Sequence, residues 1–274
     1  MTLKEKVQAT RRNSIKCSLT EVKRKTGKKL YTKVGGNPDL PKDFEWYYNC
    51  KEYGGHPLSF VAQFDLSELK DYDADQMLPE SGMLYFFYDF EADAIGCYPE
   101  DRESARVFYY DGAKENLVET EPPENLKEDY RIPEFRIKFS KHKDIPAYEE
   151  LKEQLDEEMT YEDYAFWASI LRGRIRQENI VKLLGYADLI QTEIISMCEL
   201  VQHGIDCSGF EYLSEKEKYH DESKEWILLF QLDVLETDDF ALIIGDTGRL
   251  YYYIKKQDLK EKRFDKAWFA TQCY

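Results

Sequence analysis

The chain has 274 residues, 42% of them apolar, and a formal net charge of −16 from 38 basic and 54 acidic side chains. This composition is typical of a folded globular protein rather than a disordered one. The negative charge argues against binding to nucleic acids or anionic membranes, both of which need clustered lysine and arginine. A basic protein is the kind of partner that such a charge would attract.

The cysteines and the N-terminal segment favour a cytoplasmic location. The six cysteines are scattered and include no C-x-x-C pair, so they suggest reduced thiols rather than a disulfide framework. No apolar run approaches the roughly 18 residues of a membrane-spanning helix. The first residues also lack the apolar core of a signal peptide. We expect a cytoplasmic protein with no membrane segment and no cofactor.

The first part of the chain is expected to be rich in strands. Alternating apolar residues and an abundance of tyrosine and phenylalanine are typical of pleated surfaces. Glycine and proline interrupt this pattern at 35–41, where we expect a turn. The predicted strands cover about 14–22, 57–66, 82–89, 104–110 and 130–139.

Two apolar runs have the same pattern, Pro57–Leu66 and Glu225–Val234. Each ends in Gln-x-Asp and is followed by an aromatic strand that begins with a glycine. That glycine comes 19 residues after the glutamine in the first copy (82 − 63) and 17 in the second (248 − 231). Agreement of both content and spacing predicts an internal duplication. Alternation predicts that Phe60, Ala62 and Phe64 share one face of the first run.

The centre of the chain changes to helical periodicity. Apolar residues recur at helical spacing in 148–159 and 160–175, and a third short helix is predicted over 178–184, ending at Gly185. The predicted fold is therefore a single α+β domain of internally duplicated β-rich halves with a central helical insert. Its predicted parts are a first half of about 1–140, an insert of about 144–206 and a second half of about 207–274.

No arrangement of residues in the sequence predicts catalysis or metal binding. Gly245–Gly248 has the form of an aspartic protease loop, but that mechanism needs two aspartates, and the segment before Gly82 lacks the second motif. Cys198, His203 and Cys207 could supply soft ligands, but their spacing fits no zinc pattern. We therefore predict no catalytic residue and no metal ligand.

The two Gln-x-Asp pairs are the candidate ligand-binding residues. If the repeats pair about a pseudo-two-fold axis, the pairs could converge on one polar patch between apolar walls, as in a small-ligand site. The alternative is structural, with these side chains satisfying loop backbone groups near the strand ends. The four candidate residues are Gln63, Asp65, Gln231 and Asp233.

An ordered succession of motifs resembles the bacterial YwqG-like proteins, a family of unknown function. The motifs begin with Lys33-Val34-Gly35-Gly36-x-Pro38-x-Leu40-Pro41 and end with Gly245-Asp246-x-Gly248-Arg249-Leu250-Tyr251 and the terminal Gln272-Cys273-Tyr274. The resemblance covers about 33–274. It implies an α+β fold with internal duplication and no established activity, and it suggests a role in bacterial toxin–immunity systems.

The functional hypothesis is a non-catalytic protein-binding module, with an immunity protein against a cationic toxin as its specific form. Complementary charge would speed encounter with a basic partner. The alternative is a small-ligand-binding protein or an enzyme with a polar site between the two repeats. The loop Glu115–Asp129 and one predicted helix are the candidate contact regions. The contact residues of that helix are Glu149, Glu150, Glu153, Asp156 and Glu157.

Overall fold

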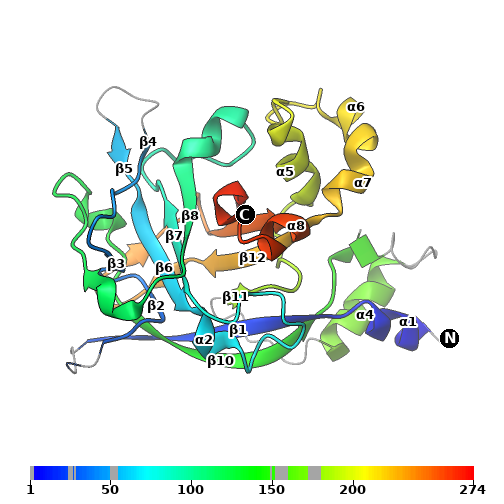
Figure 1. Ribbon diagram of the computed structural model, residues 1–274. Coiled ribbons are helices and arrows are strands. Elements are labelled where there is room, and N and C mark those ends of the chain that lie inside the picture. The colour runs from blue at the N-terminus through cyan, green and yellow to red at the C-terminus, as the bar shows by residue number, and fades with distance from the viewer. Residues whose placement is uncertain are drawn as a thin grey trace.

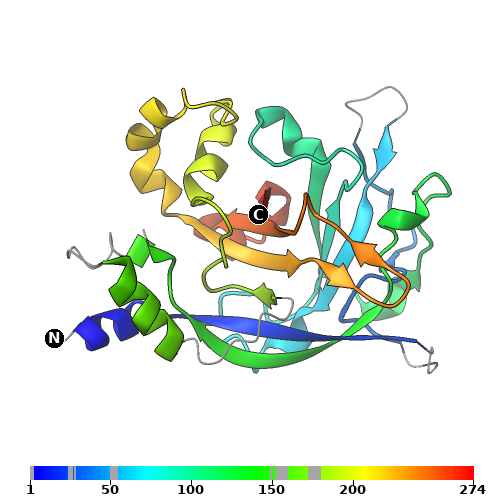
Figure 2. The same ribbon diagram turned by 180° about the vertical axis from the view of Figure 1, so that it is seen from behind.

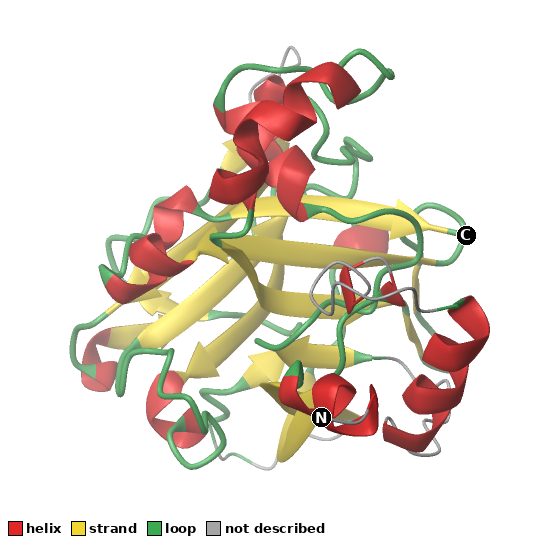
Figure 3. Ribbon diagram, turned by 90° about the vertical axis from the view of Figure 1, so that its right-hand side faces the viewer, coloured by secondary structure: helices red, strands yellow, loops and turns green. Residues whose placement is uncertain are grey.

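A ten-stranded antiparallel sheet organises the computed structural model, which describes residues 3–23, 27, 29–49, 55–148, 150–151, 160–171 and 180–274. The strands lie in the order β16-β15-β12-β11-β1-β10-β2-β6-β7-β8. The sheet is strongly curved, and short helices lie around it (Figure 3). Its strands are β1 (Arg12–Glu21), β2 (Lys33–Val34), β6 (Ser59–Asp65), β7 (Met83–Tyr88), β8 (Ala105–Tyr110), β10 (Phe135–Asp144), β11 (Val181–Leu183), β12 (Trp226–Asp233), β15 (Gly248–Lys255) and β16 (Trp268–Cys273).

The remaining elements are short. Three two-stranded pairs accompany the main sheet: β3 (Asp39–Pro41) with β9 (Leu117–Glu119), β4 (Tyr48–Asn49) with β5 (His56–Pro57), and β13 (Leu235–Glu236) with β14 (Ala241–Leu242). The helices are α1 (Leu3–Ala9), α2 (Leu66–Leu69), α4 (Tyr161–Leu171), α5 (Ile195–Gln202), α6 (Leu213–Lys216), α7 (His220–Ser223) and α8 (Lys256–Lys260). The 3₁₀ turns are η1 (Pro99–Ser104), η2 (Lys114–Asn116), η3 (Glu128–Tyr130), η4 (Glu217–Tyr219) and η5 (Phe264–Lys266).

The β-rich character expected from the sequence is confirmed. A large, nearly closed sheet dominates the chain, and the helices are few and short. The longest described helix, α4, has 11 residues, and none in the described part of the chain has both the length and the apolarity to cross a membrane.

The two longest strands, β1 and β10, lie at the centre of the sheet order. They run side by side along one side of the molecule (Figures 1 and 2). Outward from this pair, one arm of the sheet continues through β2, β6, β7 and β8, and the other through β11, β12, β15 and β16. The strand β1 pairs with β11 on its other side, and β10 pairs with β2. Each arm is therefore joined to a long strand from the other part of the chain.

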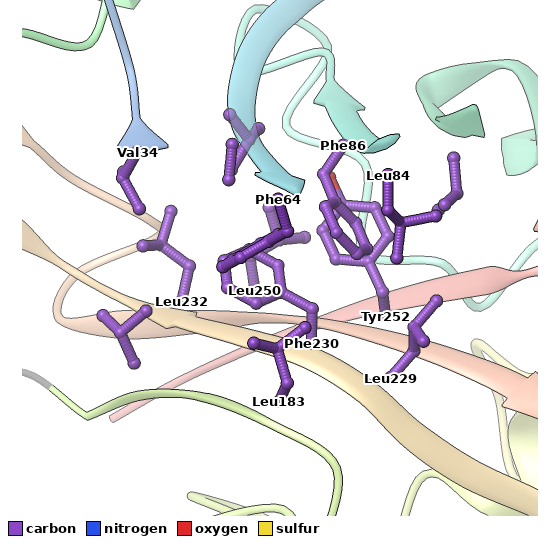
Figure 4. Packing of buried hydrophobic residues seen from close by; sticks show 14 of the residues in the cluster. Val34, Phe64, Leu84, Phe86, Leu183, Leu229, Phe230, Leu232, Leu250 and Tyr252 are labelled. Carbon is purple, nitrogen blue, oxygen red and sulfur yellow. The ribbon is translucent and has the colours of Figure 1, made fainter. Parts of the chain in front are cut away.

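The main apolar core lies where the inner faces of the two arms meet. Phe64 and Phe86 from one arm pack against Phe230 and Tyr252 from the other (Figure 4). The ring centroids of Phe86 lie 4.7 Å from Phe230 and 4.9 Å from Tyr252. The Tyr252 hydroxyl also donates to the carbonyl oxygen of Phe87 at 3.1 Å. These contacts make the core common to both arms.

A β-bulge changes the predicted faces of both apolar runs. The register shifts between Phe60 and Ala62 in β6, and between Leu228 and Phe230 in β12. An inserted residue reverses the alternation beyond it. Phe60 therefore lies in the outer cluster with Tyr85 and Phe87, whereas Ala62 and Phe64 lie in the inner core. The prediction of one continuous apolar face was wrong for this reason.

The predicted helix over 178–184 was also wrong. Residues Val181–Leu183 form β11, which pairs with β12 on one side and β1 on the other. Both terminal residues of β11 are fully buried. A short apolar run cannot be assigned to helix or strand by periodicity alone, and here pairing on both sides decides the outcome. The range 144–206 thus contains a strand of the main sheet.

Candidate functional site

Two buried lysines are the most unusual polar residues of the sheet. Lys33 in β2 lies opposite Gln63 in β6, and Lys182 in β11 lies opposite Gln231 in β12. Each lysine side chain is only 4% exposed. Lysine is almost never this buried unless a partner compensates its charge.

The first cluster joins Lys33 to two carboxylates and one amide. The Lys33 Nζ lies 3.2 Å from Asp39 Oδ2 and 3.4 Å from Glu134 Oε2. Gln63 Nε2 donates to Asp39 Oδ2 at 2.9 Å, and Gln63 Oε1 accepts from the Asp39 backbone N–H at 2.8 Å. The Tyr85 hydroxyl donates to the carbonyl oxygen of Asp39.

The second cluster repeats these contacts. The Lys182 Nζ lies 2.5 Å from Asp188 Oδ2 and 2.9 Å from Asp144 Oδ2. Gln231 Oε1 accepts from the Asp188 backbone N–H at 2.9 Å, while Gln231 Nε2 donates to Asp188 Oδ2 at 3.3 Å. The Tyr251 hydroxyl donates to the carbonyl oxygen of Asp188 at 2.9 Å. The two clusters therefore share these contacts, although each also has one of its own, Lys29 with Asp39 in the first and Arg249 with the carbonyl oxygen of Asp188 in the second.

A tight turn positions the aspartate in each cluster. The aspartate follows the lysine by six residues in both, and two residues of positive φ lie between them. In the first turn these are Gly35 (φ 63°) and Gly36 (φ 70°), and in the second they are Leu184 (φ 60°) and Gly185 (φ 76°). The pattern Lys-x₂-Gly-x₂-Asp is thus visible in the sequence at both places, although sequence reasoning missed it.

Lys182 is suited to a structural rather than a chemical role. Burial alone would lower the pKa of Lys182, but Asp188 and Asp144 outweigh that effect and raise it above the ordinary value. A lysine held as an ammonium ion has no free electron pair with which to attack a substrate or accept a proton. The contacts in this cluster therefore favour cross-linking of strands and turns over catalysis.

The predicted ligand residues have different surroundings from those expected. Besides Asp39, Gln63 donates to the carbonyl oxygen of Tyr31 at 3.1 Å, and Gln231 donates to that of Ile180 at 3.2 Å. Both glutamines are fully buried. Within the described residues, Gln63 contacts Asp39 and Gln231 contacts Asp188, each on the face of its own arm that points away from the shared core. The two pairs therefore do not share one patch, and their role in binding a ligand stays a prediction.

The two predicted aspartates anchor loops and ion pairs. Asp65 caps α2 by accepting from the Ser67 backbone N–H at 3.1 Å, and it also pairs with Lys114. Asp233 accepts from the Ile180 backbone N–H at 3.1 Å and from Arg249 Nε at 3.1 Å. Both thus satisfy nearby backbone groups.

The predicted acidic contact residues are only partly described. Glu149, Glu153, Asp156 and Glu157 lie outside the described residues, and Glu150 is half-buried. The loop Glu115–Asp129 is described throughout. It contains β9 and most of η2 and η3, so much of its backbone has a defined conformation.

The other residues considered from the sequence have ordinary surroundings. Asp246 is exposed in the turn before β15. The Nε2 atom of His203 lies 2.9 Å from Glu199 Oε1. Among the described residues, no group of three or more His, Cys, Asp or Glu side chains could hold a metal ion.

Glu199 lies at the centre of a set of polar residues that was not predicted from the sequence. This buried carboxylate accepts from Trp226 Nε1 at 2.7 Å and pairs with Lys255 Nζ at 2.7 Å, in addition to its contact with His203. Burial raises the pKa of Glu199, but these three partners outweigh burial and lower it overall. Its place in the middle of an apolar helix, ISMCELVQ, is the sequence signal that could have indicated a compensated buried charge.

The fold and its two matched clusters define a β-rich protein in which two buried lysines are paired with carboxylates. This chain belongs to the family described as Domain of unknown function (DUF1963), whose model matches residues 32–273. The matched range contains both lysines and both glutamines of the clusters. No curated protein matches the chain significantly.

Proposed function

We propose that the protein is a non-catalytic binding module that captures a basic protein partner in the cytoplasm. The resemblance to YwqG-like proteins gives this proposal its specific form, an immunity protein that neutralises a cationic toxin. The observation that carries the proposal is an ordered and exposed acidic surface. This surface, residues 111–129, is called the acidic segment below.

The acidic segment concentrates negative charge on a fixed backbone. It contains seven carboxylates and two lysines, for a net charge of −5 (2 − 7). Lys114 and Lys127 are both engaged with carboxylates outside the segment, Asp65 and Glu91 respectively. The exposed carboxylates of the segment are Asp111, Glu115, Glu119, Glu121, Glu124, Glu128 and Asp129.

Several contacts hold the acidic segment in place. The side chains of Leu117 and Leu126 within the segment are buried, and its strand β9 pairs with β3. The backbone N–H of Thr120 donates to the carbonyl oxygen of Pro38 at 2.8 Å. Arg131 Nη2 donates to the carbonyl oxygen of Leu126 at 2.9 Å. A charged surface that is already ordered loses little conformational entropy when a partner binds.

The test is a triple charge reversal in the acidic segment. Glu115→Lys, Glu121→Lys and Glu124→Lys together change the net charge by +6 without removing a buried side chain. A partner isolated from the native host with the wild-type protein should associate with the variant at least tenfold more slowly at low salt. The rate should also depend less on salt concentration, as measured by stopped-flow mixing.

A control variant separates local contact from total charge. Glu217→Lys, Glu222→Lys and Glu236→Lys change the net charge equally at exposed positions elsewhere. This variant should keep most of the wild-type association rate. Equal slowing by both triples would show a general charge effect rather than contact at the acidic segment. An association rate unaffected by salt and by both triples would exclude electrostatic capture.

We also infer that the two arms descend from one duplicated unit. The matched lysine clusters and the bulges at equivalent places support this. The register of the long strands supports it further, because their pairing looks the same in both directions from Ser18 and Lys138, which lie opposite each other. Ile15, three residues from Ser18, lies opposite Leu183 in β11, and Phe135, three residues from Lys138, lies opposite Val34 in β2. In this interpretation β1 is the first strand of the first unit and β10 is the first strand of the second, and each of them pairs with the arm formed by the other unit.

The ligand-binding alternative receives less support. The side-chain amide of each candidate glutamine is already engaged within its cluster. Its oxygen accepts from the backbone N–H of the aspartate, and its nitrogen donates to the aspartate carboxylate and to a backbone carbonyl oxygen. A ligand would have to displace these contacts to bind there. We therefore place the functional surface on the exterior of the first arm.

A further inference from the structure

Two cysteines meet where the connection between β7 and β8 contacts the loop that follows α5. Cys97 lies in that connection, and Cys207 lies in the loop that follows α5. The backbone N–H of Cys207 donates to the carbonyl oxygen of Cys97 at 2.9 Å. Both thiols are free and buried in the same apolar cluster.

The backbone contact makes the two residues direct spatial neighbours. A disulfide needs such closeness, because it joins residues whose Cα atoms lie about 4.4–6.8 Å apart. The Cys207 thiol also lies close enough to Cys97 for a charge there to affect its pKa. Burial raises the pKa of Cys207 to about 12, and a charge on Cys97 contributes to that rise.

The loops that carry these cysteines are held firmly. Trp268 Nε1 donates to the carbonyl oxygen of Gly96 at 2.9 Å, and the Gly96 N–H donates to Asp101 at 3.0 Å. On the other side, the Ile205 N–H donates to the carbonyl oxygen of Leu200 at the end of α5 at 3.2 Å. Two fixed backbones keep the cysteines together in the folded protein.

We propose that Cys97 and Cys207 form an oxidation site, which a low-molecular-weight disulfide such as glutathione disulfide converts into an intramolecular disulfide. One cysteine thiolate attacks a sulfur of glutathione disulfide, forming a mixed disulfide and releasing one glutathione. The second cysteine then attacks the protein sulfur, forming the Cys97–Cys207 bond and releasing a second glutathione. The two thiol protons end on the two glutathione thiols, and two electrons pass from the protein to the reagent.

The reaction should be slow at neutral pH and faster in alkali. Burial is the main cause that raises the pKa of Cys97 to about 11, and it raises the pKa of Cys207 to about 12. Only the thiolate is nucleophilic, so little of either cysteine is reactive near pH 7. In a reducing cytoplasm both residues would remain thiols until glutathione becomes oxidised.

The disulfide would connect distant parts of the chain. It would close a loop of 110 residues (207 − 97) between the β7–β8 connection and the helical layer outside β12. Closing so long a loop restricts the unfolded chain strongly. The midpoint of thermal unfolding should therefore rise by about 5–10 °C on oxidation.

The experiment treats the folded full-length protein with glutathione disulfide at pH 8.5. The reaction is stopped with acid, free thiols are alkylated, and disulfide-linked peptides are identified by mass spectrometry. We expect one linked pair containing Cys97 and Cys207, together with the rise in thermal midpoint. Reduction with dithiothreitol should reverse both changes.

Three variants identify the partners. Cys97→Ala and Cys207→Ala should each abolish the linked peptide and the shift in thermal midpoint. Cys198→Ala should preserve both. Cys198 is the third thiol of the cluster, and a charge on Cys207 contributes to raising its pKa, but the backbone N–H of Cys207 is bonded to Cys97, whereas that of Cys198 is bonded to Ile194 in its own helix. A Cys198–Cys207 bond, a stable mixed disulfide without closure, or no oxidation of the folded protein would each overturn the proposal.

Discussion

At the scale of single residues, the buried charges are the most informative feature. Lys33, Lys182 and Glu199 are each at most 4% exposed, and each has at least two partners of opposite charge or polarity. Removing one partner from such a group leaves an uncompensated charge in a poorly solvated site, which is more costly than removing the whole group. The stability of the protein should therefore be sensitive to single substitutions at these positions.

The substitution Lys182→Met should destabilise the protein by about 3–5 kcal/mol. It leaves the carboxylates of Asp144 and Asp188 without their ammonium ion. Lys138→Met, at an exposed position of β10, is the control and should change stability by less than about 0.5 kcal/mol. Urea denaturation at pH 7 measures both. Equal effects of the two substitutions would contradict the structural role of Lys182.

Because of Lys182, we expect the folded protein to lose stability at alkaline pH. Its pKa is raised in the folded protein, chiefly because Asp188 and Asp144 outweigh the opposing effect of burial. The folded state therefore holds the proton more tightly than the unfolded state, where the pKa is 10.5. Its contribution is complete below pH 10.5 and declines as the pH rises above that value. The stability difference between the wild type and Lys182→Met should narrow over this range in urea titrations.

Because of Glu199, we expect the folded protein to lose stability at acidic pH. Its folded pKa is lowered from 4.5, since Lys255, Trp226 and His203 outweigh burial. The contribution of this carboxylate is therefore present above pH 4.5 and declines as the pH falls below it. Glu199→Gln should cost about 1.5–3 kcal/mol at pH 7 and progressively less below pH 4.5. A difference that stays constant from pH 7 to pH 3 in urea denaturation would disprove this account.

At the scale of elements, the turns after β2 and β11 determine where the aspartates lie. A Cβ atom added to Gly35 would stand 2.2 Å from the carbonyl oxygen of Pro133, a backbone atom that cannot move alone. The sequence indicated this turn through its glycines and proline, but it did not indicate that the turn holds a buried carboxylate. Lysine is usually exposed, so nothing local suggested that Lys33 and Lys182 point into the protein.

The substitution Gly35→Ala should destabilise the protein by about 2–5 kcal/mol, combining the cost of a positive φ with the steric overlap. Gly204→Ala is a matched control, because Gly204 also has a positive φ of 75° but open space around it. It should cost only about 1–2 kcal/mol. Thermal unfolding measures the stability lost in each variant. Equal losses in Gly35→Ala and Gly204→Ala would show that overlap with Pro133 contributes nothing.

The limits of sequence reasoning are also clearest at this scale. The Gln-x-Asp runs identify β6 and β12 because long apolar segments with this polar pair near one end are distinctive. Strict alternation then fails beyond each bulge, since the register shift depends on pairing with β7 or β15 rather than on the run itself. Likewise, β11 has only three residues, and its partners lie far away in the sequence.

At the scale of the whole molecule, the shared core should make the two arms unfold together. Phe64 and Phe86 meet Phe230 and Tyr252 across the interface of the arms, so neither arm can open without exposing the other. Hydrophobic burial of this kind is the main source of cooperative stability. The arms are therefore not expected to behave as independent domains.

Two single-tryptophan variants test this cooperativity. One keeps Trp46, which packs in the outer cluster of the first arm, and the other keeps Trp226 in the outer cluster of the second. The remaining tryptophans are replaced by phenylalanine in each. The fluorescence midpoints in urea should agree with the far-ultraviolet circular dichroism midpoint of the same variant. Separate fluorescence and dichroism transitions would show that the arms unfold one after the other.

The central position of β1 has a consequence for the order of events during synthesis. Ile15 pairs with Lys141 on one side and with Leu183 on the other, so its final partner is made 168 residues later (183 − 15). At about 5–20 residues per second, a ribosome needs roughly 8–34 s to cover that interval. During this time the nascent β1 keeps at least one edge unpaired, and such edges are prone to bind other chains. The first strand to emerge is therefore among the last to be completed, and shielding it by a chaperone would matter most in that interval.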